Sequence, residues 1–264
     1  MAQGQLVKMS ARLEEGRVHY TMHLGADAVD MNALIGRPLT VRFTGELSCI
    51  NCNSRVKKFY GQGFCWNCLQ TAPEASECIV RPELCRAHLG EGRDPQWEND
   101  HHNTEHFVYL SQSGGFKVGV TRATQIPTRW IDQGAVQAVI IARTPYRQLA
   151  GLIEVELKKH FADKTNWRTM LTAVAPDRTV MDDLRTKAMQ AMAVQLGAYA
   201  LDSEEPLTIQ YPVLAHPPKV TSVGLEKVPV ISGTLCGIKG QYLLWDDGRV
   251  FNVRNHSGYH VALE

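Results

Sequence analysis

The chain has 264 residues, of which 44% are hydrophobic and 21% charged, so it is long enough to bury a substantial core. Its 28 basic and 27 acidic side chains give a net charge of +1. This excludes a strong overall electrostatic field that would attract nucleic acid or membranes, so any basic surface must be local. The N-terminus lacks the apolar core of a signal peptide and the longest apolar runs are too short to span a bilayer, so we expect a soluble, cytoplasmic protein with no membrane partner.

The first part of the chain changes character at Cys49. Alternating apolar and polar residues predict a strand at 39–44, within an N-terminal β segment that we place at residues 1–48. Over residues 49–106 the composition shifts to Cys, His, Gly and Pro with little periodicity. We expect a metal ion to replace a hydrophobic core in this second segment.

The second half of the chain predicts a small αβ domain at residues 107–204 and a C-terminal β segment at 205–264. In the first of these we expect strands at 107–110, 116–120 and 136–142. A helix should start near Pro127, and two further helices should span 148–161 and 182–199. In the second, a hairpin turn at 246–249 joins strands at 242–245 and 250–253. We therefore expect an α+β fold in which the two terminal segments build one β domain.

Four cysteines form two C-x-x-C pairs separated by twelve residues. Each pair places two thiolates on a tight turn, and two pairs complete a tetrahedral shell for one ion. A redox motif needs only one pair, so two pairs favour metal, with an iron–sulfur cluster as the alternative. The sequence thus predicts a structural zinc ion in a reducing compartment, held by Cys49, Cys52, Cys65 and Cys68.

A second group of metal-ligand residues follows the first. It contains two further cysteines and several histidines, on a stretch that Pro82 and Gly90 divide into loops. We place a second zinc ion on Cys78, Cys85, His88 and His102. The alternative is packing cysteines and solvated histidines, so the chain holds one or two zinc ions.

The loop between the two C-x-x-C pairs carries Arg55, Lys57 and Lys58 among aromatic residues. Basic side chains beside aromatic rings suit phosphate contacts and base stacking, so we predict that this loop binds nucleic acid. Trp130 lies in a polar stretch of the αβ segment and is a further candidate for the binding cleft. The alternatives are a solvated surface for the loop and a core position for Trp130.

Residues 107–167 carry an ordered series of motifs: Val108–Leu110, Lys117–Gly119, Arg129, Glu154 on the next long helix, and Asn166. In this order the segment resembles the GIY-YIG endonuclease superfamily. Tyr109 stands in the first motif, and Lys117 occupies the place where the family has its second tyrosine. The chain as a whole also resembles a family of uncharacterised bacterial proteins with a cysteine-rich N-terminal half.

The resemblance implies hydrolysis of a phosphodiester with one divalent metal ion. By this resemblance Glu154 would hold Mg²⁺ or Mn²⁺ and Arg129 would bind the scissile phosphate. Tyr109 would help to activate the attacking water, and Asn166 would orient groups around the metal or the substrate. Lys117 would neutralise phosphate charge.

Each of these residues also has a simpler interpretation. Tyr109 suits a strand core, Glu154 pairs with a lysine one helical turn later, and Asn166 suits a turn. Because the motifs occur in order, we expect a zinc-containing nucleic-acid-binding protein with a GIY-YIG-like domain, and we rank binding of nucleic acid above its cleavage by a divalent-metal-dependent DNA or RNA endonuclease activity. The alternatives are a non-catalytic nucleic-acid-binding module and a non-catalytic, zinc-stapled protein-interaction scaffold.

Overall fold

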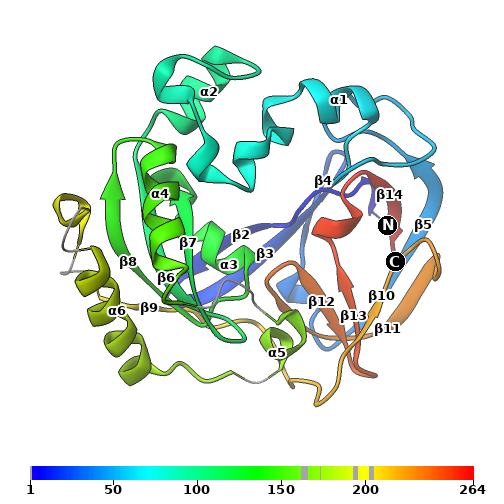
Figure 1. The fold of residues 1–264 in the computed structure, drawn as a ribbon. Helices are drawn as coiled ribbons and strands as arrows, with labels where there is room; N and C mark the ends of the chain where they lie inside the picture. Colours follow the sequence, from blue (N-terminus) through cyan, green and yellow to red (C-terminus); the bar gives the residue numbers. More distant parts are fainter. Residues whose placement is uncertain (1, 162–165, 173, 193–195, 202–204) are drawn as a thin grey trace.

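The computed structural model describes residues 2–161, 166–172, 174–192, 196–201 and 205–264. Within these residues the strands form three β-sheets, and the helices are few and mostly short, so the fold is mixed α+β. Figure 1 shows two of the sheets on opposite sides of the molecule, with the cysteine-rich segment around α1 and α2 running across one end.

The largest sheet combines strands from both ends of the chain in the order β1-β14-β5-β11-β12-β13-β10. The strands are β1 (Ala2–Gln5), β5 (Pro38–Leu47), β10 (Thr221–Val223), β11 (Val230–Lys239), β12 (Tyr242–Trp245), β13 (Arg249–Asn252) and β14 (Tyr259–Leu263). The first strand pairs antiparallel with the last, which brings the two termini together (Figure 1). Gly248 has a φ of +82° in the turn between β12 and β13, where a side chain would be strained.

A smaller sheet, β2-β3-β4, packs against the largest one. It consists of β2 (Ser10–Glu14), β3 (Arg17–Leu24) and β4 (Asp27–Asp30). Alternate residues of β3 from Val18 to Leu24 are buried, and they join a core that also contains Val41 and Phe251 of the largest sheet. The N-terminal segment therefore forms more strands than the one expected at 39–44.

The third sheet has the order β7-β6-β8-β9 and carries helices on one face. Its strands are β6 (His106–Gln112), β7 (Phe116–Arg122), β8 (Gln137–Thr144) and β9 (Leu207–Thr208). Helices α4 (Arg147–Leu157) and α6 (Arg178–Met192) contact one face, where Val108, Leu110 and Ile153 share a core. On the other face Tyr109 and Ala138 join the core of the terminal sheets. The αβ unit is thus packed between helices and the β domain.

Three helix boundaries differ from the sequence prediction by more than one residue. Helix α4 ends at Leu157 rather than Phe161. Helix α6 begins at Arg178 because the Asp177 carboxylate accepts a hydrogen bond from the Val180 amide at 3.0 Å, which caps the first turn. It ends at Met192, and a 3₁₀ turn follows at Gly197–Tyr199; residues 193–195 of the predicted helix lie outside the described residues.

The cysteine-rich segment contains two helices, α1 (Trp66–Thr71) and α2 (Pro95–His102), with four 3₁₀ turns between them. The turns used below are η3 (Glu77–Ile79) and η4 (Pro82–Leu84). Two further short elements contribute to the candidate site, namely α3 (Thr128–Asp132) and η8 (Arg254–His256). In the part of the chain that the structure describes, no helix is both long and apolar enough to cross a membrane.

Candidate functional site

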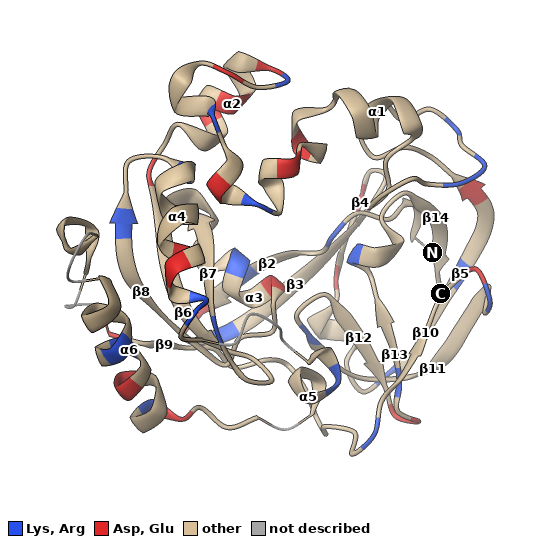
Figure 2. Ribbon diagram, viewed as in Figure 1, with Lys and Arg blue, Asp and Glu red and all other residues tan. Residues whose placement is uncertain are grey.

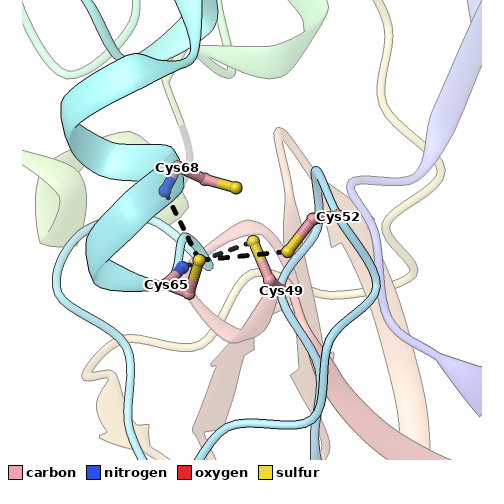
Figure 3. Close-up of side chains that lie close together, drawn as sticks. All are labelled: Cys49, Cys52, Cys65 and Cys68. Atoms are coloured by element: carbon pink, nitrogen blue, oxygen red, sulfur yellow. Dashed lines mark hydrogen bonds between the residues drawn. The ribbon is translucent and has the colours of Figure 1, made fainter.

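Cys49, Cys52, Cys65 and Cys68 converge, and their sulfur atoms point toward one another (Figure 3). Cys65 is the N-cap of α1, and its sulfur accepts a hydrogen bond from the Cys68 amide at 3.4 Å. The Cys65 amide in turn donates to the Cys49 sulfur at 3.3 Å. Hydrogen bonds from Ser54 lower the pKa of Cys52 to about 6, which favours its thiolate. Backbone turns at both pairs thus present sulfur ligands to one point.

The spacing of the four sulfurs fits a tetrahedral metal ion. All lie within 4.8 Å of one another, and the sulfurs of Cys52 and Cys65 are 3.9 Å apart. A tetrahedron with Zn–S bonds of about 2.3 Å has edges of about 3.8 Å. The four thiols are therefore able to hold an ion such as zinc, and a shell of four thiolates leaves no open position for substrate.

The second group of ligand residues differs in one member from the sequence prediction. Cys78, Cys85 and His102 come together as expected, but the fourth residue is Glu98, and all four are buried. His88 lies elsewhere, because its ring stacks on Tyr146 with centroids 4.4 Å apart. Glu98 and His102 stand four residues apart on α2, which places them on one face of the helix. That spacing is a signal that sequence reasoning missed.

A pocket of about 270 Å³ lies where the αβ sheet meets the cysteine-rich segment and the C-terminal turn η8. Of the five residues predicted as catalytic, it is lined by Tyr109, Lys117, Arg129 and Glu154. They come from β6, β7, α3 and α4 in that order. The lining also includes residues that the sequence did not single out as catalytic: Gln62, Ile79, Val80, Pro82, Gln133, Arg147 and Arg254.

Tyr109 forms part of the pocket floor. It pairs across the sheet with Gly119, and a Cβ atom at Gly119 would lie 2.6 Å from the Tyr109 hydroxyl. The hydroxyl donates a hydrogen bond to Oε1 of Gln133 at 3.0 Å. Burial raises the pKa of Tyr109, so the hydroxyl stays protonated near neutral pH. The side chain is fully buried, and this position supports the pocket rather than exposing a base to solvent.

Replacement of Gly119 by alanine should destabilise the protein by about 1–3 kcal/mol, because the added methyl group must displace the tyrosine hydroxyl or separate the two strands. Urea denaturation monitored by tryptophan fluorescence measures the effect. Gly115→Ala is the matched control, since nothing lies within 4 Å of the point that its new methyl group would occupy, and its stability should change by less than about 0.5 kcal/mol. Equal stabilities of the two variants would contradict this packing.

The pocket is strongly cationic. Among the residues that line it, Lys117, Arg129, Arg147 and Arg254 face a single carboxylate, that of Glu154. The Nε atom of Arg129 is buried and has no hydrogen-bond partner among the described residues. Charges elsewhere are mixed over the whole fold (Figure 2), so this positive charge is local in a chain of net charge +1. Such a pocket attracts anions.

An adjoining cavity of about 230 Å³ extends the cationic surface. It shares Arg129, Arg147 and Arg254 with the first pocket and adds Arg122 and Lys8 to its lining. Lys8 is paired with the Asp132 carboxylate at 2.9 Å. The two cavities together form one groove, which we call the cationic groove.

Two predicted site residues lie outside this groove. Asn166 is exposed and caps α5 (Trp167–Leu171), where its Oδ1 accepts a hydrogen bond from the Arg168 amide at 3.0 Å. A short side chain with a carbonyl oxygen at a helix start accepts a hydrogen bond from a backbone N–H group that has no partner within the helix. Trp130 is only 3% exposed and packs edge-on against Tyr109 in the core. Neither side chain is positioned to contact a ligand in the groove.

The basic loop residues Arg55, Lys57 and Lys58 are exposed but do not line the groove. Arg55 pairs with Glu46, and the Lys58 ammonium lies 4.9 Å from the ring centre of Tyr60. Beside them the rings of Tyr60 and Trp66 are 48% and 58% exposed and pack edge to face. Sequence reasoning missed Trp66, although its place inside a C-x-x-C turn leaves little room to bury it.

The fold and the site define a mixed α+β protein in which a cluster of four cysteines able to hold a metal ion lies near a cationic groove. Residues 36–261 match the family model described as "Protein of unknown function (DUF2797)", and the chain belongs to this family. The match spans both ligand clusters and the whole pocket lining. No curated protein and no solved structure matches the chain.

Proposed function

We propose that the protein binds nucleic acid in the cationic groove and that the pocket is a GIY-YIG-like centre for metal-dependent phosphodiester hydrolysis. The observation that supports this proposal is the convergence of Lys117, Arg129 and Glu154 around one pocket, with Tyr109 in its floor. These residues are far apart in the sequence and come from two strands, a short helix and a longer helix. Their order along the chain is that of the motifs named above.

The groove suits a phosphate chain better than an isolated anion. A guanidinium group donates two parallel hydrogen bonds to phosphate oxygens, and Arg129 and Arg254 each offer such a group. Arg147 adds positive charge, because its Nε and Nη2 atoms already donate hydrogen bonds to backbone carbonyl oxygens. The shared position of these arginines between the two cavities would hold one phosphate, and the lining of the second cavity would receive the next. Near-zero net charge favours recognition through this local surface over general attraction to polyanions.

Glu154 favours hydrolysis over binding alone. The residue is 8% exposed, and its carboxylate lies 3.5 Å from the Lys158 ammonium. A carboxylate repels phosphate, so a site that only bound phosphate would be better served by a neutral side chain. Mg²⁺ and Mn²⁺ commonly use one or two carboxylates together with substrate phosphate oxygens, and a single buried carboxylate fits that donor set. A divalent ion bound there would polarise the phosphate and stabilise charge on the leaving oxygen.

The other residues would bind and orient the substrate. Arg129 would hold the scissile phosphate, and Lys117 on β7, which lines the same pocket, would neutralise its charge. Tyr109 fixes the Gln133 amide at the pocket wall through its hydrogen bond. This assigns Tyr109 a positioning role in place of the water activation that the family resemblance implies.

The proposal is tested with single-stranded, duplex and branched DNA and RNA, assayed for binding and for cleavage with Mg²⁺ or Mn²⁺. Arg129→Ala should weaken binding about 10-fold or more, because a charge-assisted, bidentate contact is lost. Arg143→Ala is the control: Arg143 is exposed on β8, pairs with Glu105 and lines neither cavity, so binding should change less than about 2-fold.

Equal effects of the two arginine variants would refute the groove as the binding site. Binding that depends on Arg129 without cleavage under either metal would refute the hydrolytic part and leave a non-catalytic nucleic-acid-binding module. Failure of the wild-type protein to bind any of the substrates at low salt would refute the proposal as a whole.

A further inference from the structure

We infer that Cys78, Cys85, Glu98 and His102 form a second zinc site, and that its ion holds one wall of the pocket against α4. This inference concerns the chain's own architecture and is independent of what the pocket binds. It rests on the geometry of the four ligands, on the scarcity of other packing around them, and on three direct contacts between this segment and α4.

The four ligand atoms lie within 4.8 Å of one another, and the residues are 9%, 2%, 3% and 2% exposed in chain order. The Cys78 sulfur is 3.8 Å from Nδ1 of His102, close to the roughly 3.6 Å edge of a tetrahedron with Zn–S and Zn–N bonds of normal length. The same nitrogen is hydrogen-bonded to the Glu98 carboxylate. One position therefore lies between sulfur, nitrogen and oxygen donors, and either a proton or a metal ion fits there.

Helix α2 is built to present two of these ligands. Asp94 caps it by accepting hydrogen bonds from two first-turn amides, and Pro95 occupies the first helical position. Glu98 and His102 then point in the same direction, one turn apart. A Cβ atom at Gly92 would lie 2.4 Å from Cγ of Glu98, so the chain passes the carboxylate closely without a side chain of its own.

The donor set selects zinc over harder ions. Mg²⁺ and Ca²⁺ take oxygen ligands, whereas two thiols, one imidazole and one carboxylate form a mixed set that suits the borderline-soft zinc ion. All four positions of a tetrahedron are filled by protein, so the site is structural. Because a metal ion binds thiolates and unprotonated imidazole, occupancy of this site should fall as the pH is lowered.

The segment has only a small apolar core of its own. Its buried apolar cluster consists of Cys78, Cys85 and Ala87, and two of these three residues are ligands. Three of its larger apolar side chains are exposed: Val80 is 68%, Leu84 41% and Leu89 57% exposed. A buried carboxylate beside thiols is costly unless its charge is compensated, and a divalent ion compensates it. A metal ion thus accounts for both the missing core and the buried charge.

The segment also touches the helix that carries Glu154. Arg147, in the first turn of α4, donates hydrogen bonds to the carbonyl oxygens of Cys78 at 2.9–3.0 Å and of Ile79 at 2.9 Å. One turn later, Gly151 lets the η4 backbone approach so closely that a Cβ atom there would lie 2.2 Å from the Glu83 amide nitrogen. Residues 147, 151 and 154 share one face of α4.

These contacts place the metal ligands next to the pocket. Ile79, Val80 and Pro82, which lie between the two cysteine ligands, line the pocket together with Glu154 of α4. Because Cys78 and Cys85 bracket this stretch, an ion that holds both fixes the stretch at each end. The ion would therefore act as a positioning device for the pocket wall.

Zinc content after reconstitution tests the site. The protein is loaded with excess Zn²⁺ under reducing conditions, desalted and analysed for metal, with two ions per chain expected for the wild type. Glu98→Gln, which preserves shape, and Cys85→Ser should each hold one firmly bound ion, with affinity at the altered site reduced at least about 10-fold. Cys236→Ser is the control, because Cys236 belongs to neither cluster, and it should hold two. One ion in the wild type, or two tightly bound ions in both ligand variants, would overturn the inference.

Hydrogen exchange separates the positioning role from the site itself. Amides of residues 79–84 should exchange at least about 10-fold faster in Glu98→Gln than in the wild type, because the stretch is released at both ends. Gly151→Ala should speed exchange of the same amides while leaving two zinc ions bound, since it pushes η4 away from α4 without touching a ligand. Loss of zinc in Glu98→Gln with unchanged exchange at 79–84 would refute the positioning role and retain the metal site.

Discussion

Replacement of Cys68 by serine should remove the ion from the four-cysteine cluster and unfold residues 49–72. Zinc-finger peptides gain about 10–16 kcal/mol from their ion, and the small core of this segment cannot compensate for such a loss. That core consists of Cys49, Phe64, Cys68 and Ala72, of which two are ligands. The expected result is one fewer zinc ion per chain and trypsin cleavage after the exposed Arg55, Lys57 and Lys58 that is faster by at least about 10-fold.

The rest of the fold should persist in this variant, because the buried cores of the sheets include no residue of 49–72. The effect should nevertheless reach the pocket. A Cβ atom at Gly63 would lie 2.7 Å from the Ser257 carbonyl oxygen, so the loop packs directly behind η8, which carries Arg254. Nucleic-acid binding should therefore weaken along with zinc loss.

Two comparisons make this result specific. Cys236→Ser should show wild-type zinc content and wild-type proteolysis. A zinc chelator added to the wild-type protein should reproduce the cleavage pattern of Cys68→Ser, and added Zn²⁺ should reverse it. Unchanged zinc content or unchanged trypsin sensitivity in Cys68→Ser would contradict a structural ion at these four cysteines.

The four-cysteine cluster was predictable because the two ligands of each pair lie close together in the sequence. Each C-x-x-C turn fixes two ligands by backbone geometry, and the structure needs only to bring two such turns together. The second cluster was only partly predictable. His88 is close to Cys85 in sequence, but the chain turns its ring onto Tyr146, whereas Glu98 reaches the cluster through the helical spacing to His102. A search for Glu and His four residues apart would have found it.

In the pocket, too, some residues are predictable from sequence motifs, whereas others depend on contacts between distant parts of the chain. Tyr109, Lys117, Arg129 and Glu154 belong to a motif order that is readable along the chain, and the structure brings them together. Arg254 joins them only because β14 returns the C-terminus beside the first strands, which places η8 at the pocket. No sequence pattern near Arg254 predicts that this residue lies at the pocket.

Two residues were assigned to the site because their chemistry fitted, and both serve local structure. Asn166 begins a helix, where an amide side chain is favoured without any ligand. Trp130 fills the core below the pocket because the short helix α3 turns its apolar residues inward. Residue type alone does not distinguish a ligand-binding role from a structural role, because the role depends on the direction in which a short helix faces.

For the fold, most strands of the αβ unit and of the C-terminal hairpin were predictable from period-two patterns. The sheet β2-β3-β4 was missed although its signals are present. Alternate apolar residues run through β3 from Val18 to Leu24, and Glu15 and Gly16 form a tight turn with positive φ angles of 48° and 79°. The pairing of both chain ends in one sheet depends on contacts across more than 250 residues, between Ala2 and Leu263, and no local pattern specifies that register.

Substitution of Glu154 by glutamine should abolish metal-dependent cleavage while nucleic acid remains bound. The change removes the only carboxylate among the residues that line the pocket and leaves its shape intact. Loss of an electrostatic contribution of this kind lowers rates by about 10²–10³-fold. Without divalent ions the variant should bind at least as tightly as the wild type, because a repulsion between carboxylate and phosphate is gone. Its zinc content should be unchanged.

The matched control is Glu156→Gln on the same helix. Glu156 pairs with Lys159 at 2.5 Å on the solvent-facing side and lines neither cavity, so this variant makes the same change of charge away from the pocket. It should cleave at the wild-type rate within about 2-fold. Cleavage that survives in Glu154→Gln, or that falls equally in both variants, would show that the buried carboxylate does not hold the catalytic ion. Weaker metal-free binding by Glu154→Gln would instead show that this carboxylate supports the pocket's structure rather than opposing a bound phosphate.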